Sequence, residues 1–152
     1  MWNNTRLTQL IGLKYPIIQA PMAGGATSPA LVVSVCNAGG LGSLGAGYLS
    51  ADQIREAIKT IRKGTKNPFA VNLFIPEPAS ATHEQMQKSC AAINQCAAAL
   101  NPHIEPKKGP YASNFDEQVN ILLEEKIPVF SFTFGMLSPD LIKLFKLNIE
   151  IK

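Results

Sequence analysis

The sequence predicts an α/β fold with parallel strands, because short apolar runs alternate along the chain with longer segments of helical periodicity. The runs are apolar at consecutive positions, which is typical of strands covered on both faces. The last run, at 149–151, has no helix after it, whereas a complete (β/α)8 barrel needs about 250 residues. We therefore expect residues 1–152 to form one domain, the N-terminal half of a TIM-type barrel, with strands one to four, the start of strand five and the second half absent.

The strands are predicted from short apolar and β-branched runs that Pro or Gly bounds. The first run, 17–20, lies between Pro16 and Pro21 and is expected to be a buried strand. The other strands are expected at 41–44, 69–74, 128–134 and 149–151.

The helices are predicted from their capping residues. Ser28 followed by Pro29 is an N-cap with proline at the first helical position, and Gly39 is suited to the left-handed end of that helix. Ser50 with Gln53 has the spacing of a capping box, as has the pair at 82 and 85. Helices are therefore expected over 29–38, 51–64, 83–100, 115–126 and 139–146, with a surface loop at 101–114.

The composition excludes several classes of function. The 14 basic and 11 acidic residues give a net charge of +3, and the basic residues are scattered, which does not favour nucleic-acid binding. The first residues do not have the pattern of a signal peptide, and no apolar run reaches about 20 residues, so we expect no membrane association. Cys36, Cys90 and Cys96 lack CxxC spacing, which argues against a disulfide framework or a zinc site and indicates a cytoplasmic protein.

Residues 40–45 match the G-x-G-x-x-G pattern of dinucleotide-binding proteins. That pattern binds a pyrophosphate only where a strand precedes it and a helix follows it at once. Here a helix precedes it, and its leucines belong to a predicted strand. Gly39 and Gly40 are better explained as the end of a helix, and Gly42 as a site of close packing.

Three segments carry a resemblance to a known family: PIIQAPMAGGATSPALVVSVCNAGGLGSLGAG, PFAVNLFIPEP and PVFSFTFG. They resemble the N-terminal half of the nitronate monooxygenases, formerly called 2-nitropropane dioxygenases, which are FMN-dependent barrel enzymes. The resemblance is collinear from about Tyr15 to the last residue. The enoyl-acyl-carrier-protein reductases, which are related flavin barrels, share the Q-x-P-M-x-G and N-A-G-G-L-G segments.

The resemblance implies that FMN is the cofactor and places Ala20, Pro21 and Met22 along its isoalloxazine ring. Main-chain atoms approach a flat ring closely only where side chains are small, which explains the bare QAPMAGG segment. Gly24 and Gly25 are expected to leave space for the substrate, although a tight turn without a ligand also explains them.

Asn72 is the one strongly polar residue of its predicted strand, and the resemblance makes its carboxamide a ligand of the flavin's pyrimidine edge. A core asparagine with satisfied hydrogen bonds is the alternative. Thr133 and Phe134, at the end of another predicted strand, are expected to line the substrate pocket, with core packing as the alternative.

The resemblance implies that the whole protein is a flavin-dependent monooxygenase that oxidises alkyl nitronates with O2 to a carbonyl compound and nitrite. The family's catalytic histidine lies in a glycine-rich segment beyond residue 152, and His83 and His103 are interpreted as surface residues. No catalytic residue is therefore predicted in this chain, which we expect to be inactive alone. The alternatives are an enoyl-thioester reductase and a non-catalytic truncated half-barrel that self-associates through its exposed sheet edges.

Overall fold

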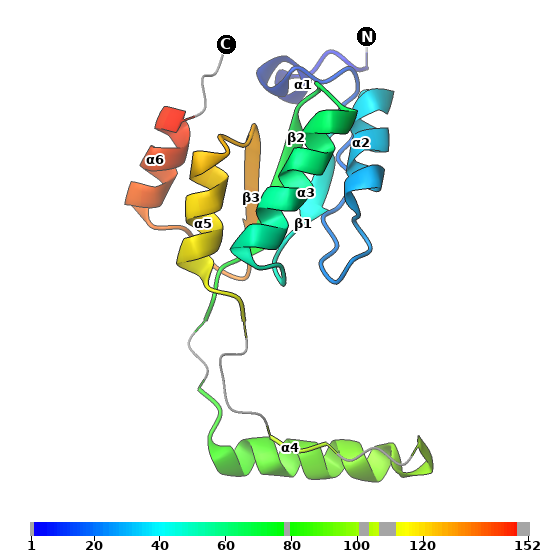
Figure 1. The fold of residues 1–152 in the computed structure, drawn as a ribbon, viewed down its shortest axis with the longest axis vertical. Coiled ribbons are helices and arrows are strands. Elements are labelled where there is room, and N and C mark those ends of the chain that lie inside the picture. Colours follow the sequence, from blue (N-terminus) through cyan, green and yellow to red (C-terminus); the bar gives the residue numbers. More distant parts are fainter. Residues whose placement is uncertain (1, 78–79, 101–103, 107–111, 149–152) are drawn as a thin grey trace. The chain divides into compact units, whose positions relative to one another are not determined.

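The computed structural model describes residues 2–77, 80–100, 104–106 and 112–148. Its three strands form a parallel sheet with the order β1-β2-β3, joined by helices as the sequence predicts (Figure 1). In chain order the elements are α1 (Arg6–Ile11), α2 (Pro29–Ala38), β1 (Gly42–Gly45), α3 (Ala51–Gly64), β2 (Phe69–Phe74), α4 (His83–Cys96), a 3-10 turn η1 (Ala98–Leu100), α5 (Phe115–Glu124), β3 (Val129–Thr133) and α6 (Pro139–Asn148).

The chain divides into two compact units. Unit 1 comprises Met1–Pro76 and Ala112–Lys152 and holds the sheet, and unit 2 comprises Glu77–Tyr111 and holds α4 and η1. Unit 2 is thus inserted between β2 and α5, directly after the carboxyl end of β2.

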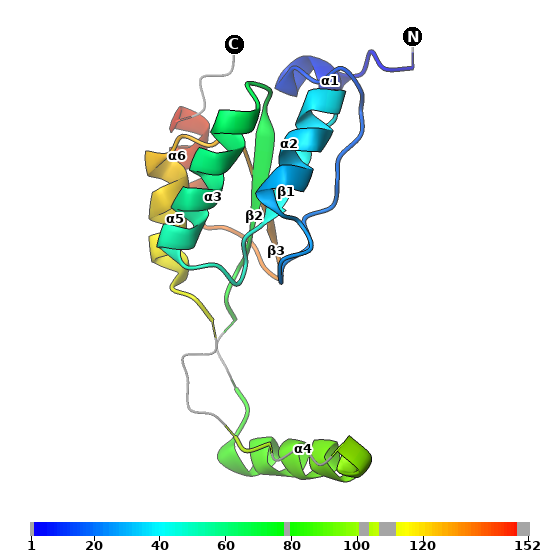
Figure 2. The same ribbon diagram turned by 45° about the vertical axis from the view of Figure 1, so that its right-hand side comes forward.

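The hydrophobic core of unit 1 lies between the sheet and the helices on one of its faces (Figures 1 and 2). Alternate strand residues, such as Leu44 and Val71, point to this helix-covered face. Their neighbours, Gly45 and Asn72, are register partners and point to the opposite face, as does Ser131, the partner of Asn72 on β3. The core cluster consists of Val32, Cys36, Leu44, Ala46, Ile54, Ile58, Ile61, Phe69, Val71, Leu73, Val119, Ile121, Leu122, Ile127 and Phe145.

Local sequence signals explain most helix boundaries. The Ser28 side chain accepts a hydrogen bond from the amide of Leu31, and Gly39 ends α2 in the left-handed conformation with φ of 100°. The predicted capping boxes of α3 and α4 both form. Gly42 is a site of close packing, because a Cβ there would lie 2.9 Å from the Cys36 sulfur on α2.

Three sequence predictions need correction. The segment 17–20 is not a buried strand: only Ile18 bridges to Leu41, in parallel, and Ile17 and Ile18 are 53% and 52% exposed. Its outer side pairs with no other strand that the described residues form. The helix predicted over 83–100 ends at Cys96, and its apolar stripe is not buried. Helix α1 was not predicted at all. The predicted strand at 149–151 lies outside the described residues.

Helix α4 has no buried residue, so its apolar stripe faces no core within unit 2. The side chain of Asn94 holds a neighbouring segment by donating to the carbonyl of Ile104 and accepting from its amide, at 2.9 and 3.0 Å. A surface hollow of about 500 Å³ lies beside the helix. It is lined by Ser80, Ala81, Gln85, Met86, Ser89, Cys90, Glu105 and Pro106.

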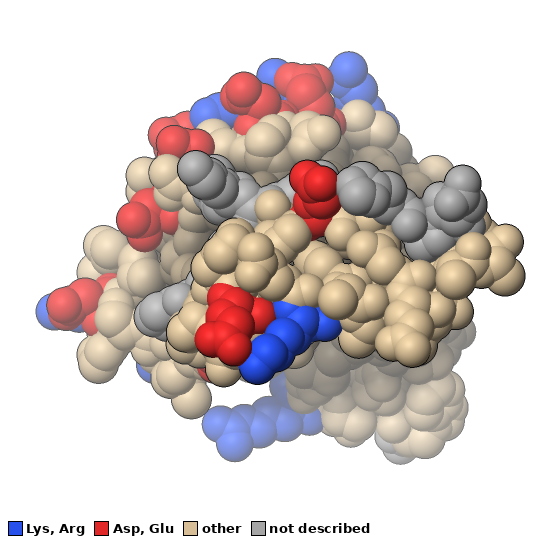
Figure 3. Space-filling view, turned by 90° about the horizontal axis from the view of Figure 1, so that it is seen from below, with Lys and Arg blue, Asp and Glu red and all other residues tan. Residues whose placement is uncertain are grey.

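Charged side chains are dispersed on the face shown in Figure 3, where Lys and Arg occur in small groups among uncharged residues. No helix formed by the described residues combines the length and the apolar character that a membrane span requires.

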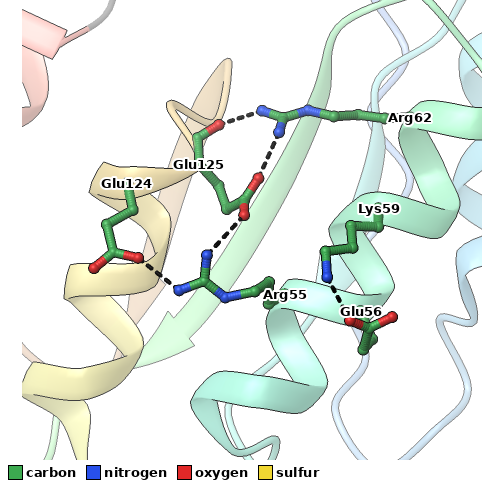
Figure 4. A network of polar contacts seen from close by, with 6 residues as sticks. All are labelled: Arg55, Glu56, Lys59, Arg62, Glu124 and Glu125. Atoms are coloured by element: carbon green, nitrogen blue, oxygen red, sulfur yellow. Dashed lines mark hydrogen bonds and ion pairs between the residues drawn. The ribbon is translucent and has the colours of Figure 1, made fainter.

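Ion pairs join helix α3 to helix α5 (Figure 4). Arg55 reaches Glu124 at 2.6 Å and Glu125 at 3.1 Å, and Arg62 reaches the other oxygen of Glu125 at 2.6 Å. Arg62 also donates to the main-chain carbonyl of Glu125. The hydrogen bond from Arg55 to Glu124 raises the pKa of that guanidinium. The network fixes the spacing of two helices that cover the same face of the sheet.

Candidate functional site

The site is built around Gly45, the last residue of β1. A Cβ at this position would lie 2.5 Å from the carbonyl carbon of Met22 and 2.6 Å from the nitrogen of Ala23. Such distances are far below van der Waals contact, so only glycine allows the main chain of residues 22–23 to lie against the strand. The QAPMAGG segment is thereby held at the carboxyl end of β1, on the face opposite the helices.

Thr27 holds this arrangement with a single hydroxyl group. Its Oγ1 accepts a hydrogen bond from the amide of Gly45 at 2.8 Å and donates one to the carbonyl of Met22 at 2.9 Å. Thr27 is buried, so water does not compete for these bonds. The loop between the first strand segment and α2 is therefore tied at both ends, by Met22 and by Thr27.

Gln19 takes the place of a strand residue next to β1. After the bridge at Ile18, the Gln19 carboxamide accepts from the amide of Ser43 at 3.0 Å and donates to the carbonyl of Ser43 at 3.2 Å. It also donates to the carbonyl of Ala20. A side chain thus continues the hydrogen-bond ladder beyond the main-chain bond from the Gln19 amide to the Leu41 carbonyl.

Asn72 lies beside Gly45 in the sheet and is buried. Its Nδ2 donates to the hydroxyl of Ser131, its register partner on β3, at 3.0 Å. No described residue donates to Asn72 Oδ1. This oxygen is therefore not completely buried, although Asn72 as a whole is only 3% exposed. A serine hydroxyl donates as well as accepts, so Asn72 can offer either half of its carboxamide to a ligand.

Two polar groups at this end of the sheet remain available. The carbonyl of Met22 is bonded to Thr27, whereas no described group accepts a hydrogen bond from the Met22 amide. The Asn72 carboxamide offers the second group, one strand further along the sheet. A main-chain donor and a carboxamide beside a glycine cradle suit one edge of a flat heterocycle, so the residues present fit the flavin that the resemblance implies.

The remaining predicted residues surround these groups at the carboxyl ends of the strands. Gly24 and Gly25 have φ of 89° and 100°, and no atom lies within 4 Å of a Cβ built on either, so the loop is open above them. Thr133 ends β3, and its carbonyl accepts from the amide of Ile75 at 2.9 Å. Phe134 follows with φ of 67° and packs edge-on against Phe74.

The structure therefore brings together the predicted site residues from both parts of the sequence. Met22 lies against Gly45, which is the register partner of Asn72, and Ala20 and Pro21 directly precede Met22 in the chain. The sequence did not predict the supporting roles of the Gln19, Thr27 and Ser131 side chains. Gln19 had a signal, because it begins the Q-x-P-M-x-G segment, whereas no motif pointed to Thr27 or Ser131.

No other chemistry is evident in the described part of the chain. No three His, Cys, Asp or Glu residues gather there to hold a metal ion, and all three cysteines are free thiols. Cys36 is buried, and this burial raises the pKa of its thiol. His83 is the first residue of α4 in unit 2, and His103 lies outside the described residues.

Comparison with known proteins adds three findings. Residues 4–149 match the sequence profile of a family described as nitronate monooxygenase. The chain is 40% identical over 146 residues to a probable nitronate monooxygenase of Staphylococcus aureus strain MSSA476, a match that covers 96% of this chain and 41% of that protein. The chain thus spans about two fifths of the length of this relative.

Solved structures are similar as well. A nitroalkane oxidase from Streptomyces ansochromogenes superposes with a TM-score of 0.79 at 38% identity, covering 95% of this chain and 40% of that one. FabK from Thermotoga maritima superposes with a TM-score of 0.65 at 30% identity, covering 95% of this chain and 35% of that one.

Proposed function

The chain belongs to the nitronate monooxygenase family, and we propose from this premise that it supplies one wall of an FMN site in an enzyme that oxidises alkyl nitronates with O2. The proposal includes that residues 1–152 form part of a (β/α)8 barrel. The observation that carries it is the common position of the Met22 main chain and the Asn72 side chain, joined through Gly45 at the carboxyl ends of β1 and β2. Active sites of such barrels lie at this end of the strands.

The chain's own residues would bind and orient the ring. The Met22 amide would donate to the ring's edge, and its peptide plane would be fixed because Thr27 holds the carbonyl. Asn72 would pair with the pyrimidine edge through one half of its carboxamide while Ser131 holds the other half. Pro21 sets the direction of the chain and Ala20 leaves room beside the ring.

FMN, when bound, would supply the redox chemistry by which two nitronates and one O2 become two carbonyl compounds and two nitrite ions. A nitronate is already an anion, so this substrate needs no base to remove a proton from carbon. Gly24, Gly25, Thr133 and Phe134 would border the substrate. A catalytic base is required only for neutral nitroalkanes, and the described residues of unit 1 contain no histidine.

Titration with FMN and anaerobic reduction test the proposal directly. We expect the complete enzyme, of which this chain forms one wall, to bind FMN and its flavin absorbance to bleach when a nitronate is added without O2. Asn72→Ala should weaken FMN binding about tenfold, since a hydrogen bond to a buried polar edge contributes roughly 1–2 kcal/mol. Ser131→Ala, which leaves the carboxamide in place, should have a smaller effect. Equal affinity for FMN in the protein and in Asn72→Ala would contradict this placement.

Two other functions give different results in the same experiment. If the enzyme reduces enoyl-thioesters, the flavin absorbance should bleach with NADH or NADPH and should not bleach with a nitronate. The lower TM-score and identity of FabK, compared with nitroalkane oxidase, favour the nitronate reaction. A non-catalytic half-barrel predicts self-association through the segment 17–20 or β3, seen by size-exclusion chromatography, without tight binding of FMN by a monomer.

A further inference from the structure

A buried glutamine of α5 reaches the turn that follows β1. The Nε2 of Gln118 donates to the carbonyl of Leu49 at 2.7 Å and to that of Ala46 at 3.4 Å. These two residues are the ends of a β-turn over 46–49, which is closed by a bond from the Leu49 amide to the Ala46 carbonyl at 3.0 Å. One side-chain amide therefore holds both ends of the turn.

The carbonyl of Leu49 depends on this glutamine. Leu49 precedes Ser50, the N-cap of α3, so its carbonyl lies outside the hydrogen bonds of that helix. No other described group donates to it. Gln118 is only 2% exposed, and its neighbours Val119 and Leu122 belong to the hydrophobic core. An amide in such surroundings loses its hydration, which costs free energy unless the amide forms hydrogen bonds.

The turn is joined to the candidate site at two points. Ala46 directly follows Gly45, against which the main chain of Met22 packs. The amide of Ala46 also donates to the main-chain carbonyl of Asn72 at 2.9 Å. A shift of the turn would therefore move the strand end that supports Met22 and weaken the bond that aligns this end with Asn72.

The direction of α5 places Gln118 at this end of the sheet. Helix α5 ends just before β3 begins, so its first turns lie beside the carboxyl ends of the parallel strands (Figures 1 and 2). The ion pairs of Figure 4 join Glu124 and Glu125 of α5 to helix α3. Gln118 thus reaches the turn from a helix whose own position is fixed.

We propose that Gln118 is a positioning residue of the FMN site, which acts through the turn 46–49 to hold the Met22 amide and the Asn72 carboxamide at a fixed spacing. The inference rests on the proposed function for FMN as the ligand. The competing explanation is that Gln118 only satisfies two buried carbonyls. The two explanations differ in whether loss of Gln118 weakens FMN binding beyond its effect on stability.

Gln118→Met and Leu122→Val are compared in the complete enzyme. Methionine has the length and nearly the volume of glutamine but donates no hydrogen bond. Leu122→Val leaves a small cavity in the same helix, one turn further from the site, and is the matched control for lost stability, which urea unfolding measures. We expect Gln118→Met to bind FMN about fivefold more weakly than the unsubstituted enzyme, and Leu122→Val to bind it with unchanged affinity.

Hydrogen exchange in the absence of FMN tests the turn itself. In Gln118→Met the amide of Ala46 should exchange about tenfold faster relative to the amide of Val71, which lies within β2, because the turn opens more often. Leu122→Val should leave this ratio unchanged, since it affects both amides through the stability of the whole unit. NMR resolves the two amides and measures the ratio without any flavin chemistry.

A double variant tests whether the effect passes through Gly45. Gly45→Ala displaces the main chain of Met22, so little that Gln118 holds in place remains in this variant. The loss of FMN affinity in Gly45→Ala/Gln118→Met should therefore be smaller than the product of the two single losses, whereas independent roles give the product.

Three results would each overturn the inference: normal FMN affinity in Gln118→Met, an equal loss of affinity in Leu122→Val, or an unchanged exchange ratio. Failure of the proposed function looks different. If FMN binds but no nitronate bleaches it, the proposed reaction is wrong, while the FMN affinities and the exchange ratio still decide the role of Gln118. If the unsubstituted enzyme binds no FMN, the proposed function fails, and the role of Gln118 toward FMN fails with it.

Discussion

The Thr27 hydroxyl lies 2.8 Å from the amide nitrogen of Gly45, which donates a hydrogen bond to it across 18 positions of sequence. The same hydroxyl donates to Met22, so one side chain sets the distance between the glycine-rich loop and the end of β1. A position that no sequence motif identified therefore determines where the main chain of the site lies.

Replacing Thr27 by valine removes this hydroxyl at nearly constant volume. Thr27→Val should lower the free energy of unfolding by about 2 kcal/mol, because a buried amide and a buried carbonyl lose their partner. It should also weaken FMN binding severalfold, since the Met22 peptide is no longer fixed. Thr27→Ser keeps the hydroxyl and should retain FMN binding. Urea unfolding and FMN titration measure the two effects, and a Thr27→Val variant that binds FMN normally would argue against the role.

Adding a single methyl group at position 45 should displace the loop. Gly45→Ala places a Cβ 2.5 Å from the Met22 carbonyl carbon, so the loop must move and FMN binding should fall by at least about tenfold. Gly12→Ala is the control, because Gly12 has φ of 80°, no atom within 4 Å of its built Cβ, and a position at the end of α1. That variant should lose stability through backbone strain alone, with FMN affinity retained. Equal losses of FMN affinity in the two variants would indicate a general effect of destabilisation.

Glu125 is the central acidic group of the contact between α3 and α5. It pairs with Arg55 and Arg62 and is only 15% exposed, whereas Glu124 pairs with Arg55 alone and is 58% exposed. Glu125→Gln should lower the urea midpoint by about 0.5 M, and Glu124→Gln by clearly less. Raising the salt concentration should reduce the difference in urea midpoint between each variant and the unsubstituted protein, because dissolved ions screen partly exposed ion pairs. Equal urea midpoints for Glu125→Gln and Glu124→Gln would contradict the central position of Glu125.

The three thiols should react in order of their exposure. Cys96 is exposed, Cys90 is half-buried and Cys36 is buried, with its Sγ donating to the carbonyl of Pro68. Alkylation at pH 8 followed by mass spectrometry should find Cys36 slower than Cys96 by a factor on the order of 10³, since it must wait for unfolding. Rapid alkylation of Cys36 would contradict the packing of α2 on β1.

The shifted pKa of Cys36 gives this thiol a defined influence on stability. Because burial raises the pKa, the unfolded chain loses the proton at a lower pH than the folded chain. The contribution to stability is complete below the ordinary thiol pKa of about 8.5 and decreases as pH rises above it. Replacing Cys36 by alanine should remove this part of the pH dependence.

The sequence predicted what local chemistry determines. Ser28, Ser50 and Thr82 act as N-caps as expected, because a cap depends on residues at most three positions away. Strand register and the contacts that support the site depend on segments that are distant in sequence. The residues around Thr27 do not indicate that its partner is Gly45, and those around Asn72 do not indicate that its partner is Ser131. The alternating aromatic residues at 130–134 gave a mixed signal, since Phe130 packs on Phe145 in the core whereas Phe134 is exposed.

Two expectations failed for a common physical reason. Ile17 and Ile18, and the apolar residues of α4, have the composition of buried positions, yet the described residues provide no surface that covers them. Hydrophobic pattern predicts that a face will be buried but does not identify its partner. Helix α1 was overlooked because its capping box is formed by two threonines, Thr5 and Thr8, in place of the usual glutamate or glutamine.

The bonds between Gln19 and Ser43 have a consequence for the evolution of the site. Where a carboxamide substitutes for a peptide unit, the peptides that follow need not pair with the strand, and we expect the Met22 amide to be free to contact a ligand. Among ordinary residues, only glutamine combines a donor, an acceptor and this reach. A glutamate or leucine at position 19 would leave unchanged every residue that we propose to contact FMN, and we expect it to alter binding all the same, because the strand would have to satisfy Ser43 in another way.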